Sequence, residues 1–241
     1  MNSIFSKQFL LKVKFNSGLI GLFINPFFWP RRKLFNEFKS LSSHISGKIL
    51  DVGCGKKPYK DLFKYDSYIG LDIHNEGHDH TEEDIDIYYD GKTFPCDNGE
   101  YDSLLVNQVL EHVFNPVEFL HECNRVLKND GKLLLSVPFA WNEHEQPLDY
   151  GRYSSFGIIS LLESSGFEII YHKKTLNDFR AITSMIMLYF QESTRTGKRF
   201  WDLFTSLIYI GPLNILGYFL FKLLPRVDSI FIDNVVLCRK I

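Results

Sequence analysis

Cysteine is scarce in this chain of 241 residues, and no two of its four cysteines form a CxxC pair. The sequence therefore lacks the usual pattern of a disulfide framework or a structural zinc site, and it favours reduced thiols in the cytoplasm. An excess of charge of one sign is missing as well, because the net charge is −2 at pH 7. This balance gives no general reason for binding nucleic acid, and we expect no such partner.

A long uninterrupted hydrophobic run is absent from the N-terminus. Asn16 and Pro26 break the run FNSGLIGLFINPFFWP, and the basic sequence RRK follows where a signal peptide would have a small-residue cleavage site. The pattern predicts a retained, aromatic-rich helical leader or cap over residues 1–45, ahead of a main domain over residues 46–241.

Residues 49–59, ILDVGCGKKPY, run from an apolar strand into a glycine turn that lacks two familiar phosphate-binding patterns. The turn has no GxxxxGK[ST] sequence, which excludes a Walker phosphate loop. It also lacks the third glycine of the GxGxxG dinucleotide fingerprint, because Lys56, Lys57 and Pro58 follow Gly55. A GxG pair alone is a weak sign of a ligand, since tight turns use glycine for structural reasons.

Apolar strands alternate with helical patterns along most of the chain. After KILDVG, strands are predicted at 67–73, 84–90, 101–108, 132–139, 167–174 and 229–240. Helices are predicted at 31–43 and at 115–131, the second between the N-cap Asn115 and the stop Gly131. The alternation is typical of an α/β fold with a mostly parallel sheet and helices on both faces, in which ligands bind at the carboxyl ends of the strands.

Acidic residues end two of these strands. Asp72 ends the second strand 21 positions after Asp51, which is the spacing at which a carboxylate accepts hydrogen bonds from both ribose hydroxyls of a nucleotide. Asp90 ends the third strand, where a carboxylate could accept from an adenine amino group. The fourth strand then leads into NQVLEHV.

In this order, ILDVGCG, GLDI, Asp90 shortly before Pro95, EYDSLLVNQVLEHV and GKLLLSVPF resemble successive motifs of the class I S-adenosylmethionine-dependent methyltransferases, of the type 11 kind. The resemblance runs from about residue 48 to 174 and resumes near residue 229. It implies a Rossmann-like sheet of seven strands, the last antiparallel, with S-adenosylmethionine across the ends of the first, second and fourth strands. Lys56 departs from the family, in which many members have a third small residue.

The resemblance also implies a role for individual residues of this sequence. The backbone of Gly53, Cys54 and Gly55 would approach the methionine part of S-adenosylmethionine, and Asp51 would help to hold that part and the turn. Asp72 would bind the ribose, with Ile73 packed on the adenine. Asp90 would contact the adenine amino group. Asn107 and Gln108 would lie on the sulfonium side.

The segment PFAWNEHEQPLDYGRYS, after the fifth strand, concentrates polar side chains that could serve the reaction. His144 is the first candidate for a general base, because imidazole exchanges protons near neutral pH, and Asp149 could orient or replace it. Tyr150, Arg152 and Tyr153 are candidates for binding the acceptor. The alternative is a polar lid without a role in proton transfer.

Glu111 and His112 form a second candidate catalytic pair. Some quinone-precursor O-methyltransferases of this class have a similar Glu-His pair that meets a metal, but a complete set of ligands is not recognisable in this sequence. The His-rich segment HNEGHDHTEED, residues 74–84, is interpreted as a solvated loop. We therefore predict no metal.

Residues 175–228 exceed the short connection that such folds usually have before the last strand, and they are strongly hydrophobic. Glycine, proline and asparagine interrupt the run 203–224, and the last strand must return to the same sheet, so a membrane span is rejected. A hydrophobic helical insertion is expected instead. It would act as a cap or a homodimer face, or would dock in the plane of a membrane through residues 15–30 and 201–226.

These observations predict a methyltransferase, cytoplasmic or peripheral on the cytoplasmic membrane face. We expect it to act on an oxygen of a small-molecule or lipid-linked acceptor of the sugar or quinone type. The segment VPFAWNEHEQPLDYGRYS also resembles methyltransferases of bacterial surface-polysaccharide synthesis. N-methylation of an amino sugar and an inactive scaffold subunit are the alternatives, although the intact strand-end acids argue against a scaffold.

Overall fold

The computed structural model describes residues 21–73 and 84–241, so the His-rich segment at 74–83 and the first part of the leader lie outside the described residues. The described chain forms two compact units. The sheet unit consists of residues 37–173 and 233–241. The helical unit consists, among the described residues, of 21–36 and 174–232.

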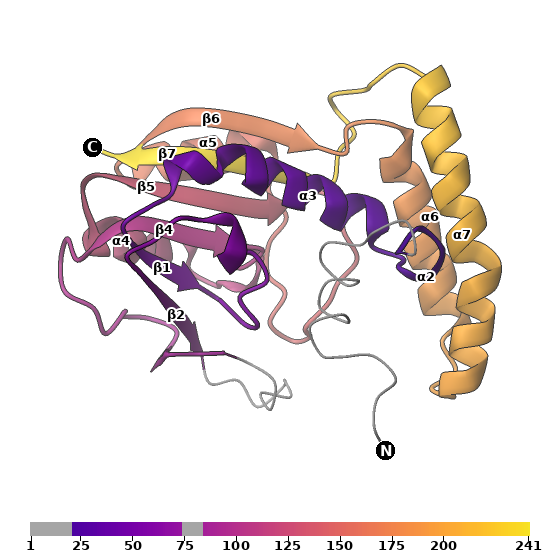
Figure 1. Ribbon diagram of the computed structural model, residues 1–241, viewed down its shortest axis with the longest axis horizontal. Coiled ribbons are helices and arrows are strands. Elements are labelled where there is room, and N and C mark those ends of the chain that lie inside the picture. The colour runs from indigo at the N-terminus through magenta and orange to yellow at the C-terminus, as the bar shows by residue number, and fades with distance from the viewer. Residues whose placement is uncertain (1–20, 74–83) are drawn as a thin grey trace. The chain divides into compact units, whose positions relative to one another are not determined.

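Seven strands form one sheet in the order β3-β2-β1-β4-β5-β7-β6 (Figure 1). Adjacent pairs from β3 to β5 are parallel, and β7 is antiparallel to β5. The strands are β1 (Lys48–Val52), β2 (Ser67–Ile73), β3 (Ile87–Tyr89), β4 (Tyr101–Asn107), β5 (Leu127–Pro138), β6 (Phe167–Thr175) and β7 (Asp233–Lys240). The predicted Rossmann-like α/β fold with an antiparallel last strand is therefore confirmed.

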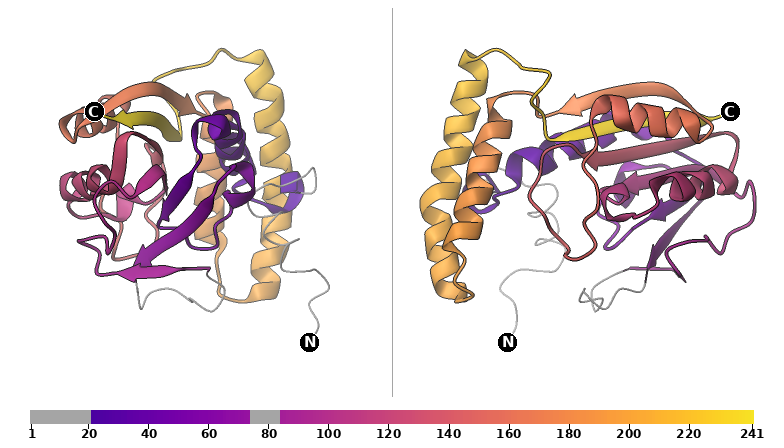
Figure 2. Two further views of the ribbon diagram at one scale, coloured as in Figure 1. Left: turned by 60° about the vertical axis from the view of Figure 1, so that its left-hand side comes forward. Right: turned by 180° about the vertical axis from the view of Figure 1, so that it is seen from behind.

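Helices α4 (Pro116–Val126) and α5 (Ser155–Ser164) cover one face of the sheet, as Figure 2 shows. The core on this face joins fully buried α4 and α5 residues such as Leu120 and Ile158 to strand residues such as Leu104. On the other face, the last turn of α3 (Phe28–Leu41) buries Phe38, whose ring centroid lies 4.9 Å from that of Tyr59. Short 3-10 turns complete the unit: η1 (Ser42–His44), η2 (Lys60–Leu62) and η4 (Leu110–His112).

The predicted helix over 115–131 is too long, because it ends at Val126. Leu127 is fully buried and pairs with Tyr101, so β4 draws this part of the chain into β5. Asn115 makes no side-chain cap; its amide donates to Glu118 instead. The last strand likewise begins at residue 233 and not at 229, because residues 227–230 form a turn in which the Ile230 amide donates to the Val227 carbonyl at 3.0 Å.

In the helical unit, α6 (Phe179–Thr194) and α7 (Arg199–Leu223) run side by side as a hairpin (Figures 1 and 2). The short helix α2 (Gly21–Ile24) packs against α7. Asn214, which is fully buried, donates from its amide to the Leu22 carbonyl at 2.8 Å and ties the two together. Among the described helices, none combines the length and the hydropathy that crossing a bilayer requires.

Candidate functional site

The glycine turn after β1 is held against the end of β2. The amide of Gly53 donates to the Leu71 carbonyl at 2.8 Å. Gly53 has a φ of +67°, and a Cβ at this position would lie 2.3 Å from a methyl carbon of Val109, so only glycine fits. Gly55 has a φ of +46°, and a Cβ there would meet nothing within 4 Å. Its backbone is therefore open to a ligand.

Asp72, at the end of β2, connects this turn to the next segment. One carboxylate oxygen accepts from the Gly55 amide at 3.0 Å and the other from the Ile73 amide at 2.8 Å. These two bonds fix the carboxylate in place, and each oxygen can accept a further hydrogen bond. The arrangement presents a positioned acceptor group at the edge of the sheet.

Asp51 lies beneath the turn and is 4% exposed. Its carboxyl accepts a 2.6 Å hydrogen bond from the Tyr68 hydroxyl, and burial raises its pKa to about 7. Cys54 is also buried, and burial raises the pKa of its thiol. Both side chains therefore support the turn from the core.

A pocket of about 490 Å³ opens above the carboxyl ends of β1, β2 and β4. This volume lies within the usual range for small-molecule sites. The residues that line it include the following predicted site residues: Gly53, Gly55, Asp72, Ile73, Gln108, His112 and Tyr150. Lining residues that the sequence reasoning missed include the apolar or aromatic Tyr89, Val109, Phe114 and Leu148, and the acidic Glu118 and Glu145. In the sequence, only their closeness to the glycine turn and the strand-end motifs indicated that they line the pocket.

The other predicted site residues do not line this pocket: Asp51, Cys54, Asp90, Asn107, Glu111, His144, Asp149, Arg152 and Tyr153. Asp90 is exposed and accepts from the Thr93 and Lys92 amides, each at 2.9 Å, and these bonds hold its pKa below the usual range. Its neighbours Tyr89 and Gly91 line the pocket. Asp90 therefore shapes the loop at the pocket edge.

Asn107 and Gln108, at the end of β4, differ in orientation. The Asn107 side chain accepts a 2.8 Å hydrogen bond from the Ser136 hydroxyl. Gln108 has a φ of +55° and lines the pocket, with its amide nitrogen 3.2 Å from the same hydroxyl. The strained turn at Gln108 thus brings the chain from β4 into the pocket wall.

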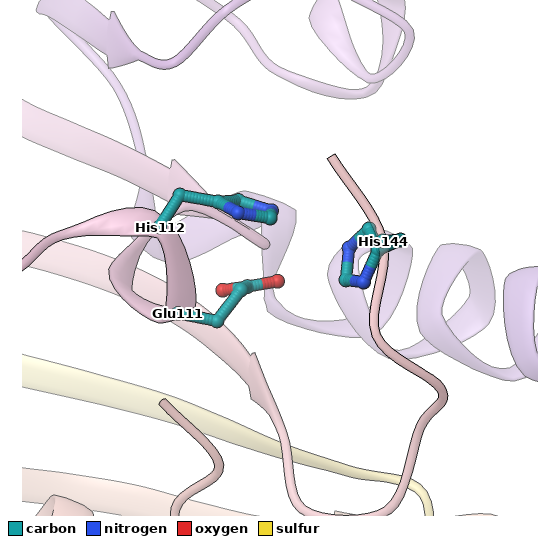
Figure 3. A group of neighbouring side chains, drawn as sticks. All are labelled: Glu111, His112 and His144. Carbon is teal, nitrogen blue, oxygen red and sulfur yellow. The ribbon is translucent and has the colours of Figure 1, made fainter. Parts of the chain in front are cut away.

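Behind this wall, Glu111, His112 and His144 converge, as Figure 3 shows. One ligand atom from each lies within 4.8 Å of the others, and the two imidazole rings are 4.8 Å apart in an edge-to-face arrangement. Glu111 is fully buried, and neither of its carboxylate oxygens accepts from another residue in the described part of the chain. Two imidazoles thus flank a buried carboxyl group whose oxygens accept no hydrogen bond from the described residues.

Carbonyl oxygens orient both histidines. Nδ1 of His112 lies 2.6 Å from the Leu148 carbonyl, and Nδ1 of His144 lies 3.2 Å from the Asn142 carbonyl. Because a carbonyl only accepts, each Nδ1 carries a hydrogen, which leaves Nε2 as the nitrogen that can take up a proton. Nε2 of His112 lies 3.5 Å from the Glu145 carboxylate, which would stabilise a proton taken up there.

Asp149 and Arg152 brace the loop that carries His144. The Arg152 guanidinium donates to both carboxylate oxygens of Asp149, at 2.6 and 2.7 Å, and the Asp149 side chain is only 4% exposed. The pair with Arg152 lowers the pKa of Asp149 to about 2. Asp149 also accepts from the backbone amide of His144 at 2.9 Å. The ion pair therefore fixes the position of His144.

Burial raises the pKa of Glu111 to about 8, so this carboxyl group is neutral at pH 7. In the unfolded chain the Glu111 carboxyl group ionises near pH 4.5, so the folded state holds the proton more tightly. The contribution of Glu111 to the free energy of unfolding therefore falls as the pH rises from about 4.5 to about 8. We expect Glu111→Gln to remove this loss and to stabilise the protein above pH 8 by on the order of 3–5 kcal/mol. Urea unfolding of wild type and Glu111→Gln at pH 5 and pH 8.5 measures this gain in unfolding free energy.

The matched control for this substitution is Glu143→Gln, which neutralises an exposed carboxylate in the loop that carries His144. It should leave the difference in unfolding free energy between the two pH values unchanged. An equal pH dependence in wild type and Glu111→Gln would contradict the burial argument.

The strand order, the antiparallel β7 and a ligand pocket over the glycine turn and Asp72 together define a class I S-adenosylmethionine-dependent methyltransferase. The model of a methyltransferase domain family matches residues 28–172, and the chain belongs to this family. S-adenosylmethionine is the methyl donor that the class uses.

Curated relatives and solved structures agree with this assignment. The chain is 27% identical over 155 residues to a probable S-adenosylmethionine-dependent methyltransferase of Mycolicibacterium smegmatis, covering 59% of this chain and 60% of that protein. It is 29% identical over 119 residues to a ubiquinone biosynthesis O-methyltransferase of Haemophilus ducreyi, covering 43% of this chain and 50% of that one. A methyltransferase structure from Archaeoglobus fulgidus matches with a TM-score of 0.56 at 13% identity, covering 98% of this chain and 100% of that one.

The residues of the pocket fit such a donor. Gly55 leaves open space above the turn, and beside it the backbone amides of Gly55 and Ile73 fix the carboxylate of Asp72. A ribose needs paired acceptors, and this carboxylate supplies them.

Proposed function

We propose that this methyltransferase transfers a methyl group to a hydroxyl oxygen of a small or lipid-linked acceptor, and that His112 removes the proton. One observation carries the proposal. His112 lines the pocket, and the Leu148 carbonyl at 2.6 Å holds its hydrogen on Nδ1, so Nε2 can accept a proton. An acceptor hydroxyl needs such a base more than a neutral amine does.

His112 takes precedence in this proposal over His144, because His144 does not line the pocket. Glu111 and His144 are proposed as positioning residues. A proton on His112 would create a cation beside the buried Glu111, and that cation would favour ionisation of the carboxyl group. Asp149, held by Arg152, would keep His144 in place.

The donor is proposed to bind along the glycine turn. S-adenosylmethionine supplies a methyl carbon that its sulfonium has already activated. Asp72 would accept from the ribose hydroxyls, Ile73 would pack on the adenine, and Asp90 would accept from the adenine amino group. The turn from Gly53 to Gly55, supported by Asp51 and Cys54, would hold the methionine part, and Asn107 and Gln108 would lie on the sulfonium side. Holding donor and acceptor in line is the main contribution of the protein.

Aromatic side chains at the pocket suggest where the acceptor binds. Phe114 and Tyr150 are exposed by 76% and 48%, and their ring centroids are 5.3 Å apart. A rigid aromatic pair of this kind offers a surface for a flat or sugar ring. Tyr150 is thus the proposed acceptor contact, whereas Arg152 and Tyr153 are proposed to support its loop.

Methyl transfer from labelled S-adenosylmethionine tests the proposal. The acceptors are 3,4-dihydroxybenzoate, a methyl hexoside and glucosamine, so that oxygen and nitrogen compete under the same conditions. We expect labelled methyl ethers and little label on the amine. The O-methyltransferase name of the Haemophilus ducreyi relative is consistent with this expectation. Label found on the amine alone would contradict it.

A further inference from the structure

The α6–α7 hairpin has large apolar side chains on the outside. On α6, the exposed residues between 182 and 190 are all apolar and fall on one helix face: Ile182, Met185, Ile186, Tyr189 and Phe190. Glu192 and Ser193, in the last turn of α6, are exposed as well. The buried positions between the apolar residues include the hydroxyl residues Thr183 and Ser184 and the apolar Met187 and Leu188. A surface helix in water has polar residues on its exposed face, and between residues 182 and 190 this face has none.

Helix α7 continues the pattern. Its exposed large apolar residues form two groups, one on each side of Pro212: Trp201, Phe204, Leu207 and Ile208, and then Leu216, Tyr218, Phe219 and Leu223. No charged residue occurs in the sequence between Asp202 and Lys222. We call the exposed apolar residues of α6 and α7 the outer stripe. A long apolar stripe without charge marks a surface that contacts something other than water.

The contact between the two helices combines an aromatic pair, in which the ring centroids of Phe190 and Tyr209 lie 5.7 Å apart, with small and polar groups. A Cβ on Gly217 would lie 2.5 Å from the Thr183 hydroxyl, so glycine is required there for the helices to approach. The buried Arg180 pairs with Asp178 inside the unit and stacks its guanidinium 3.8 Å from the centroid of the Phe221 ring. Small residues between helices and polar groups that bond one another are the packing mode of helices in lipid.

Basic and aromatic side chains occur at both ends of the hairpin. Arg195 and Lys198 are exposed in the turn before α7, close in sequence to Tyr189 and Trp201. At the other end, the Lys222 ammonium lies 4.4 Å from the centroid of the Tyr218 ring, and Arg226 is exposed. Three acids lie near the same ends: Glu192 is exposed on α6, Asp202 accepts from Thr196, and Asp228 accepts from Asn177. Such pairs of cation and aromatic ring suit the headgroup region of a bilayer.

We propose that the outer stripe docks on a lipid bilayer that contains anionic lipids. The hairpin lies in the plane of the membrane, with the outer stripe in the acyl boundary and its basic residues on the headgroup phosphates. The charge complementarity at both ends favours lipid over a second copy of the chain, whose hairpin would bring the same cations together. The proposal does not depend on which atom the enzyme methylates.

Sedimentation of the full chain with vesicles tests the docking. We expect the protein to bind vesicles of phosphatidylcholine with 30% phosphatidylglycerol. It should bind vesicles of phosphatidylcholine alone more weakly. The double substitution Ile208→Ser, Phe219→Ser should lower the partition coefficient by about tenfold or more, since it removes two large apolar contacts. Phe156→Ser is the matched control, because Phe156 is 83% exposed and lies on α5 of the sheet unit.

Two further measurements keep the test decisive if the double variant folds poorly. Lipids with a doxyl label should quench tryptophan fluorescence in wild type, and Trp201→Phe should remove most of that quenching. The change Lys222→Glu, Arg226→Glu should abolish the preference for anionic vesicles. A wild-type chain that stays in the supernatant overturns the proposal, whether light scattering finds it monomeric or a dimer through the outer stripe. Binding that the Phe156→Ser control weakens equally would also overturn it.

Discussion

Replacing Asp72 with alanine is expected to weaken the binding of S-adenosylmethionine by about a hundredfold or more. The carboxylate is already fixed by the Gly55 and Ile73 amides, so no entropy is lost in positioning it for the ribose. A hydrogen bond to a charged group contributes about 1.5 kcal/mol at the low end of the usual range, and two ribose hydroxyls would share this carboxylate. Since about 1.4 kcal/mol is a tenfold change, two such bonds account for a hundredfold.

Isothermal titration with S-adenosylhomocysteine measures this loss without any need for an acceptor. Asp66→Ala is the matched control, because it removes the same charge from an exposed position directly before β2. The affinity of Asp72→Asn, which keeps the shape of the side chain, should lie between those of Asp72→Ala and Asp66→Ala. If Asp72→Ala and Asp66→Ala bind alike, Asp72 does not contact the donor.

Replacing His112 with asparagine is expected to lower kcat by roughly 10² to 10⁴ while KM for S-adenosylmethionine changes less than about twofold. The asparagine amide can still donate to the Leu148 carbonyl, so the pocket wall keeps its hydrogen bond. What disappears is the Nε2 lone pair. A loss confined to kcat identifies an interaction that matters in the transition state and not in donor binding.

His121→Asn is the control for this change, since His121 is exposed on α4. A full loss of activity in His144→Asn together with an active His112→Asn would move the role of base to His144.

Local sequence patterns predicted the mostly parallel sheet, and the antiparallel last strand followed only from the resemblance to methyltransferases. Apolar strands of the right length, separated by helical patterns, predicted the parallel sheet, and the Gly53–Gly55 turn with Asp72 21 positions after Asp51 predicted one edge of the pocket. These features depend on neighbours in the chain or on the period of a strand. The end of α4 at Val126 was missed because pairing of Leu127 with Tyr101, 26 positions away in sequence, overrides helix propensity.

Local patterns could not predict which of the polar residues after β4 and β5 line the pocket and which are buried behind it. The backbone amides of Tyr150 and Gly151 donate to the carbonyl of Glu111, at 2.8 and 3.0 Å, and this contact folds one loop back on the other. Because of it, Glu111 is buried and His112 lies at the pocket. No local pattern encodes a hydrogen bond between loops so far apart in sequence.

The sequence by itself determined the sheet, the glycine turn and the acid at the end of β2, because periodicity and backbone conformation are local properties. Tertiary structure alone decided that Asp149 is committed to Arg152, that Glu111 has lost its contact with water, and that the outer stripe of α6 and α7 is exposed. Burial and ion pairing are properties of the folded surroundings, and a side chain acquires them only when distant segments pack around it.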